Sequence, residues 1–246
     1  MGKIAEILGI KLKPVAIYRQ DTIPDDASVP TDHCSIPPLL MKCARLGTKC
    51  AADREHVFCH GALSGFGFGG MYNREHSCWL ASDIPEEHKD EISHRGKGEF
   101  KTPGIAKLQL DAIKDYGDGK DAIVFQELDS ALEENRPIEV VVFLVDPTRL
   151  SALTLLAGYS KTTPGPAAII PYGHACQQVY ALPRSEGETD DPHAIIGMTD
   201  IYARRFVPPD VMSFSVPFNL YKRMEKDIDT SYFCRGKWPE MLEKCL

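Results

Sequence analysis

The sequence lacks long hydrophobic runs and an excess of basic residues. Its longest uninterrupted apolar run, residues 140–145, is far shorter than the ~20 residues that a membrane-spanning helix needs. The formal net charge is −7, from 28 basic and 35 acidic residues, and no basic stripe with interleaved aromatic residues is present. These absences predict a protein that binds neither a membrane nor nucleic acid.

The N-terminal segment lacks the features of a secretory signal. Residues 1–14 contain no apolar core and no small-residue cleavage site. We therefore expect a cytoplasmic protein, in which thiols stay reduced. A chain of 246 residues buries roughly three quarters of its unfolded surface, so its core does not depend on disulfides. The eight cysteines then indicate metal binding, redox chemistry or catalysis.

Strands and helices are expected to alternate along the chain. Runs of β-branched and apolar residues predict strands at 14–18, 122–125, 138–145, 167–170, 194–197 and 211–216. Caps and 3.6-residue periodicity predict helices at 2–8, 37–46, 86–93, 105–114, 150–157, 219–226 and 238–245. The apolar side of the 105–114 helix is predicted to consist of Ile105, Leu108, Leu110 and Ile113. Both faces of the 138–145 strand should be buried, because the strand is almost wholly apolar.

This alternation predicts an α/β to α+β fold. We expect a single globular fold over residues 1–246, with a mixed sheet and packed helices. The turn-rich loop at 115–121 is the best candidate for an internal boundary. It divides the chain into two possible lobes, a cysteine-rich one over residues 1–114 and a strand-rich one over residues 122–246. The apolar strands could also pair between two copies of the chain, so a homo-oligomer is compatible with the sequence.

The cysteines are clustered but not closely paired. Five of them lie between residues 34 and 78, yet no C-x-x-C occurs, which excludes zinc ribbons, thioredoxin-like motifs and bacterial ferredoxin runs. Thiols at turns and helix ends are the better ligand candidates, because backbone amides there stabilise a thiolate. Four cysteines are expected at such positions: Cys34 before a helix, Cys50 in a loop, Cys59 before a glycine-rich turn and Cys176 after a strand. Cys43, inside a predicted helix, is expected to be a core residue.

Glycine is concentrated directly after Cys59. Residues 59–70 read CHGALSGFGFGG, and Gly61, Gly65 and Gly67 allow close approach of the backbone to a ligand. The stretch differs from a dinucleotide fingerprint, so a packed glycine-aromatic turn and a loop around a cofactor are both compatible with it. We favour the cofactor loop because Cys59 stands at its edge.

Two histidines and one arginine complete the candidate site. His60 and His174 each lie within two residues of a cysteine, which suits acid–base chemistry, a mixed metal site or a structural hydrogen bond. Arg204 follows Asp200 by one helical turn, so the two form either a structural salt bridge or part of an anion-binding site.

Short motifs spread over nearly the whole chain carry a family resemblance. In the C-terminal half they are FLVDP at 143–147, LSAL at 150–153, AGY at 157–159, PYG at 171–173 with Cys176, IGMTD at 196–200, Ala203-Arg204, PPDV at 208–211 and SVP at 215–217. In the N-terminal half they are KPVA at 13–16, Cys34, ARLG at 44–47 and CHGA at 59–62. Together these residues resemble the uncharacterised ArCR family (archaeal conserved region) of archaea and anaerobic bacteria. The resemblance implies one domain without an established activity. It also implies that Cys34, Cys59 and Cys176 belong to the family pattern, whereas Cys43, Cys50 and Cys78 go beyond it.

Three functional classes follow. The leading hypothesis is an iron–sulfur protein with a [4Fe–4S]-type cluster on Cys34, Cys50, Cys59 and Cys176, which serves electron transfer or binds a substrate at an iron. Its partner would be a redox protein or a small molecule. The alternatives are a non-catalytic small-molecule binding or sensing module, and an enzyme that uses Cys176 as nucleophile with His174 as base. Structural zinc is the alternative metal. No catalytic residue is assigned from the sequence beyond these.

Overall fold

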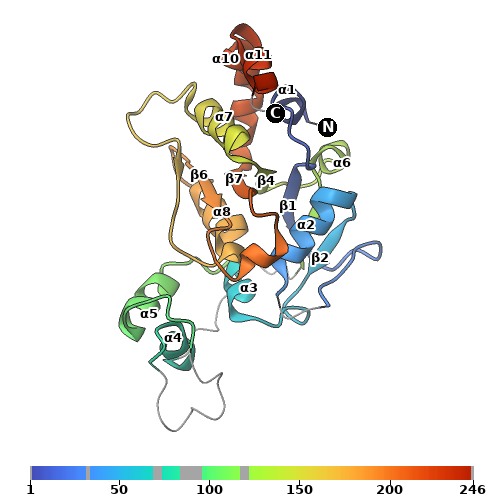
Figure 1. Ribbon diagram of the computed structural model, residues 1–246. Coiled ribbons are helices and arrows are strands. Elements are labelled where there is room, and N and C mark those ends of the chain that lie inside the picture. Colours follow the sequence, from blue (N-terminus) through green and yellow to red (C-terminus); the bar gives the residue numbers. More distant parts are fainter. Residues whose placement is uncertain (1, 32–33, 69–73, 84–95, 117–121, 245–246) are drawn as a thin grey trace.

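One mixed β-sheet organises the molecule. The computed structural model describes residues 2–31, 34–68, 74–83, 96–116 and 122–244 (Figure 1). Within these residues seven strands form a sheet in the order β2-β3-β1-β4-β7-β6-β5. Their bounds are β1 (Val15–Gln20), β2 (Cys50–Ala52), β3 (Ala122–Glu127), β4 (Val140–Val145), β5 (Ala168–Ile169), β6 (Ala194–Gly197) and β7 (Met212–Pro217). Only the β5–β6 pair is parallel. The predicted α/β fold with a mixed sheet is confirmed.

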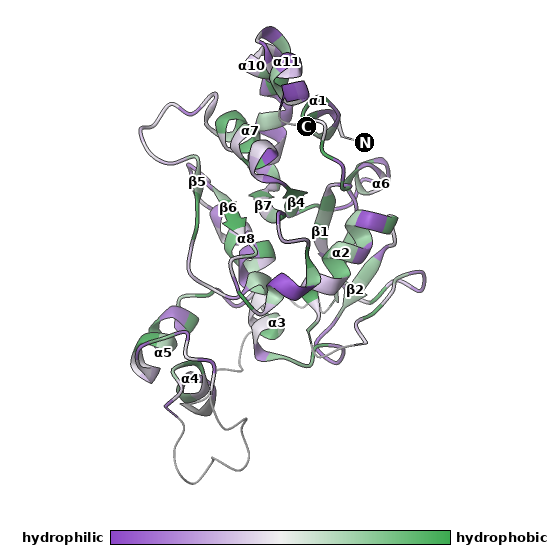
Figure 2. Cartoon of the chain, in the orientation of Figure 1, coloured by the Kyte–Doolittle hydropathy of each residue, from purple (hydrophilic) through white to green (hydrophobic). Residues whose placement is uncertain are grey.

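Helices cover both faces of this sheet. One face carries α2 (Ile36–Leu46), α3 (His60–Gly65), the π-helix η2 (Gln177–Ala181) that continues into α8 (Leu182–Glu186), and the 3₁₀ turn η3 (Ala203–Phe206). The other carries α1 (Lys3–Ile7), α6 (Leu128–Glu133), α7 (Pro147–Gly158), α9 (Phe218–Asp227), η4 (Ile228–Thr230), α10 (Tyr232–Arg235) and α11 (Trp238–Lys244). Both faces of β4 are therefore buried, as its sequence predicts. Figure 2 shows hydrophobic colour along β4 and β7 between the two layers.

Two further helices stand apart from the sheet. They are α4 (Arg74–Leu80) and α5 (Pro103–Asp111), and Figure 1 shows them at one end of the molecule. They share a small core in which Leu80 packs with Ala106 and Leu110. The predicted apolar side of α5 is wrong in part, since Ile105 and Leu108 are 41 % and 71 % exposed. The helix packs against α4 rather than against the sheet, so a narrower stripe of its surface is covered.

Residues on both sides of the loop at 115–121 build the same sheet. Strands β1 and β2 come from residues 1–114, the other five from residues 122–246, and β1 pairs with both β3 and β4. The predicted helix at 86–93 lies outside the described residues, as does most of that loop.

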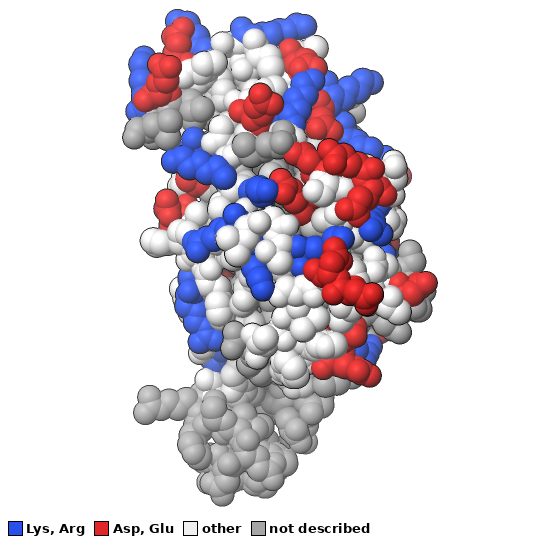
Figure 3. All heavy atoms as spheres, turned by 90° about the vertical axis from the view of Figure 1, so that its right-hand side faces the viewer, with Lys and Arg blue, Asp and Glu red and all other residues white. Residues whose placement is uncertain are grey.

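Two features of the described residues concern membrane spans and the distribution of surface charge. No helix in the described part of the chain is long and apolar enough to span a bilayer. Acidic and basic side chains are interspersed on the face seen in Figure 3, so the described residues there form no continuous basic surface.

Candidate functional site

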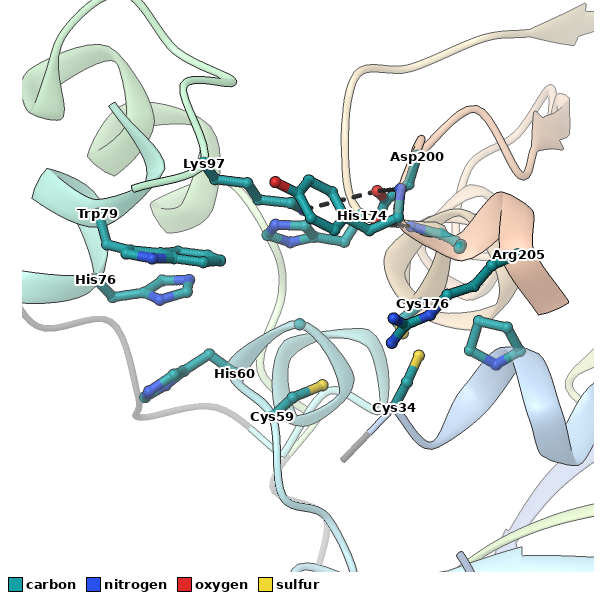
Figure 4. Close-up of a pocket in the computed structure, with 15 residues that line it drawn as sticks. Cys34, Cys59, His60, His76, Trp79, Lys97, His174, Cys176, Asp200 and Arg205 are labelled. Carbon is teal, nitrogen blue, oxygen red and sulfur yellow. Dashed lines mark hydrogen bonds and ion pairs between the residues drawn. The ribbon is translucent and has the colours of Figure 1, made fainter. Parts of the chain in front are cut away.

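A cavity of about 410 Å³ lies where α2, α3, α4, η3 and the segment before η2 meet. It is lined by residues that lie far apart in the sequence (Figure 4): Cys34, Pro37, Cys59, His60, Gly61, His76, Trp79, Lys97, His174, Ala175, Cys176, Asp200, Tyr202, Ala203 and Arg205. Its volume is in the range of small-ligand sites in proteins.

Three of the four predicted ligand cysteines meet in this cavity. Cys34 lies just before α2, Cys59 is the N-cap residue of α3, and Cys176 comes directly before η2. Burial is the main cause of the raised pKa values of Cys34 and Cys176, and the charge of Cys59 adds to both, so the thiols are near enough to interact electrostatically. Figure 4 shows Cys34 and Cys59 on the same side of the cavity.

The fourth, Cys50, lies elsewhere. It is the first residue of β2 rather than part of a loop, it is fully buried, and its Sγ donates a hydrogen bond to the carbonyl of Thr48 at 3.4 Å. It neighbours the thiol of the core residue Cys43 in α2 instead of the cavity thiols. A short strand of small residues shows little hydrophobic periodicity in the sequence. The strand conformation of Cys50 therefore depends on the pairing of β2 with β3.

Backbone amides favour the thiolates of two of these cysteines. The N–H of Ala62 donates a hydrogen bond to Cys59 Sγ at 3.3 Å. The thiol thus takes the role that a serine hydroxyl has at an N-cap. Burial raises the pKa of Cys176 well above its ordinary value, and the N–H of Ile36, the first residue of α2, opposes that rise. The start of α2 thereby connects Cys176 to the segment that carries Cys34.

A network of buried glutamines fixes the segment around Cys176. Gln177 accepts from the N–H of His174 at 3.0 Å and donates to Ser64 Oγ of α3 at 2.9 Å. Gln178 donates to the carbonyl of Pro171 and to Thr199 Oγ1. These bonds stabilise a π-helix. This geometry is rare in proteins overall, but where it occurs it often lies at a functional site. They set the positions of Cys176 and His174 relative to α3.

The glycine-rich segment is a helix rather than the favoured cofactor loop. Residues 60–65 form α3, and Gly65 lies so close to Cys176 that a Cβ there would stand 2.4 Å from Cys176 Cβ. Gly67 has a φ of +69° and packs against Tyr116. Of the described glycines in this segment, Gly61 alone lines the cavity, with the ring of His174 next to it. The glycines therefore allow helix packing, and the cavity is formed by side chains.

Charged residues form one wall of the cavity. Lys97 Nζ lies 2.5 Å from Glu99 Oε1 and 3.6 Å from Asp200 Oδ1, and it stands over the ring of Tyr202. Glu99 Oε2 also faces His174 Nε2 at 3.4 Å. Burial raises the pKa of Glu99, but the hydrogen bonds from His174 and Lys97 outweigh it and lower that pKa below its ordinary value. Both carboxylates thus offset the charge of Lys97.

Aromatic rings form a second wall. The His60 and His76 centroids are 4.5 Å apart, and His76 stacks on Trp79 at 5.8 Å. Burial and the neighbouring histidines lower the pKa of His76 to about 3, so its imidazole is neutral near pH 7. The sequence pattern indicated His60 but neither His76 nor Trp79. Their spacing of three residues on one helix face was the available signal.

Arg204 was expected to help bind an anion, but it is not among the residues that line the cavity. Its guanidinium donates to the carbonyls of Pro208 and Pro209 at 2.9 and 2.6 Å, and also to that of Val211. Asp200 accepts from the backbone of Ala175 and Tyr202 instead of pairing with Arg204. The 3₁₀ turn η3 directs the next residue, Arg205, into the cavity.

The described residues do not form a Cys–His nucleophilic pair. His174 Nε2 faces Glu99, and His174 Nδ1 is buried without a hydrogen-bond partner in the described part of the chain. Burial raises the pKa of Cys176 well above its ordinary value, with Cys59 and Cys34 adding to the effect. A catalytic cysteine has the opposite shift, because a neighbouring base or cation stabilises its thiolate.

Burial keeps the cavity thiols protonated when no metal is present. Desolvation raises the pKa of Cys34 to about 12 and that of Cys59 above its ordinary value, although the amides of Ala62 and Gly61 oppose the shift at Cys59. A metal ion would deprotonate such thiols on binding. Over all described residues, no three His, Cys, Asp or Glu side chains form a group able to hold a single metal ion.

We predict that the metal-free protein loses stability at alkaline pH. Unfolded thiols ionise near pH ~8.5, whereas Cys34 in the folded protein ionises near pH 12. Between these values the folded state binds more protons, so the free energy of unfolding should fall as the pH rises. Urea unfolding measured from pH 8 to pH 11 checks this, and Cys34→Ser should make the slope shallower. A free energy that does not change over this range would contradict the protonated state of the thiols.

Comparison with known proteins places the chain in a family. No curated protein and no solved structure matches it significantly. Residues 3–227, by contrast, match the family described as uncharacterised ArCR. This span includes every described residue that lines the cavity. The chain therefore belongs to the uncharacterised ArCR family.

Proposed function

We propose that this protein binds an iron–sulfur cluster of the [4Fe–4S] type through Cys34, Cys59 and Cys176. The observation that carries the proposal is the convergence of three thiols, from three separate segments, on one cavity. Thiolates are the ligands that such clusters use. Each cysteine of a cubane binds a different iron, so the thiols need not converge on one point as the ligands of zinc do.

The charges of the cavity support a bound cluster. Three thiolates and a [4Fe–4S]²⁺ core carry a net charge of about −1, which burial alone would destabilise. Burial raises the pKa of the Cys34 thiol to about 12, and the nearby charges of Arg205 and Lys97 oppose that rise. Both cations therefore stabilise an anionic group held by these three cysteines.

Three thiolates leave one iron without a cysteine ligand. Cys50, the fourth ligand expected from the sequence, is part of β2 and does not line the cavity. A cluster with three cysteine ligands binds an exogenous molecule at its fourth iron, and it also transfers electrons. We therefore assign the protein a redox or ligand-binding role at an iron–sulfur centre.

The test is elemental and spectroscopic analysis of protein purified without oxygen. We expect about four irons and four sulfides per chain, a visible thiolate-to-iron absorption band, and an EPR signal after reduction with dithionite. Zinc in place of iron would contradict the proposal and identify a structural metal site. Protein free of both metals, even after reconstitution with iron and sulfide, would leave the small-molecule binding module as the function.

A further inference from the structure

Arg205 is the cation of the cavity that has no acidic partner among the described residues. Lys97 faces two carboxylates, Glu99 and Asp200. Arg204 is occupied by three backbone carbonyls. Arg205 is exposed, lines the cavity, and makes a stacking contact with the neighbouring ring of Phe206 at 4.7 Å. Its guanidinium is thus available for an anion that enters from solvent.

Aromatic rings line the side of the cavity away from Arg205. Figure 4 shows the rings of Trp79 and His76 there, across the cavity from Arg205. The two rings are nearly parallel, with an interplanar angle of 24°, and His76 is neutral near pH 7 because its pKa is about 3. A surface of this kind binds the face or edge of another ring.

From these two walls we infer that the cavity binds an aromatic carboxylate, with the carboxylate on Arg205 and the ring towards Trp79 and His76. A guanidinium recognises a carboxylate through two parallel hydrogen bonds, which is the geometry that Arg supplies better than Lys. This inference rests on the proposed function, because the ligand would occupy the part of the cavity that the cluster leaves free. It names the class of molecule that the site receives.

Benzoate is the probe, with acetate as the comparison. Binding is measured by isothermal titration on anaerobically purified protein, and the EPR spectrum of the same reduced sample is recorded with and without benzoate. We expect benzoate to bind more tightly than acetate and to change the EPR signal. Arg205→Gln should raise the Kd of benzoate about 10- to 100-fold, because hydrogen bonds between charged groups are lost.

The matched control is Arg235→Gln in α10, whose exposed side chain lies outside the cavity and which should bind benzoate as the parent protein does. Iron is assayed in every sample. An iron-loaded protein that ignores benzoate, or that binds acetate equally well, overturns the inference and leaves the cluster intact. Because Arg205 also offsets the charge of the cluster, Arg205→Gln is compared with the parent protein at equal iron loading, and an unchanged Kd of benzoate in the loaded variant overturns the inference. Benzoate binding to a protein that cannot be loaded with iron would overturn the proposed function and retain the carboxylate site.

Discussion

Replacing Cys34, Cys59 or Cys176 by serine is expected to remove most of the iron from anaerobically purified protein. Each thiol lines the same cavity, and the described residues provide no other cysteine there. A serine hydroxyl has nearly the same size but is a poor ligand for iron, which prefers soft thiolates in such clusters. Each single variant should therefore retain its fold and lose its visible absorption band.

Two other cysteines provide the controls. Cys234 is exposed in α10, and Cys234→Ser should retain the iron content of the parent protein. Cys50→Ser should do the same, at the cost of some stability because Cys50 is fully buried. Iron per chain and far-UV circular dichroism, measured on all five variants, separate loss of the cluster from loss of fold. If Cys50→Ser lost iron as completely as Cys34→Ser, the assignment of three ligands would be wrong.

The sheet was largely predictable because most of its strands are rich in apolar and β-branched residues. All six predicted strands overlap observed ones, and a wholly apolar run such as residues 140–145 is typical of a strand buried on both faces. Only β2 was missed. Its sequence, Cys-Ala-Ala, has neither β-branched residues nor alternation, and its conformation depends on pairing with Ile123–Phe125 of β3. Long-range pairing of this kind leaves no local pattern in the sequence.

The candidate site was predictable only in part. Position at turns and helix starts, together with the family resemblance, selected the three thiols that meet. The same reasoning failed at Arg204, because the guanidinium that lines the cavity belongs to the next residue, Arg205. That choice depends on the 3₁₀ turn η3 and on the carbonyls of Pro208 and Pro209, which hold Arg204. Tertiary hydrogen bonds of this type cannot be read from an i, i+4 spacing.

Gly65→Ala is expected to produce the largest loss of stability among single substitutions at the site. The added Cβ would stand 2.4 Å from Cys176 Cβ and 2.6 Å from its backbone carbon, so a rotamer change of Cys176 cannot relieve the overlap. The two segments must move apart, and this also breaks the bond from Gln177 to Ser64 that joins them. Overpacking of a buried contact costs about 1–3 kcal/mol, and we expect the upper end of that range because backbone atoms collide.

Gly61→Ala in the same helix is the matched control. A Cβ at Gly61 would meet the His174 ring at 3.5 Å, an ordinary contact, and alanine favours a helix over glycine by about 1 kcal/mol. Urea unfolding should therefore show a neutral or slightly more stable Gly61→Ala and a strongly destabilised Gly65→Ala. Because Cys176 moves together with η2, Gly65→Ala should also lose iron. Equal stability of the two variants would mean that α3 does not pack on Cys176 as closely as the structure places it, and the convergence of Cys59 and Cys176 would lose its physical basis.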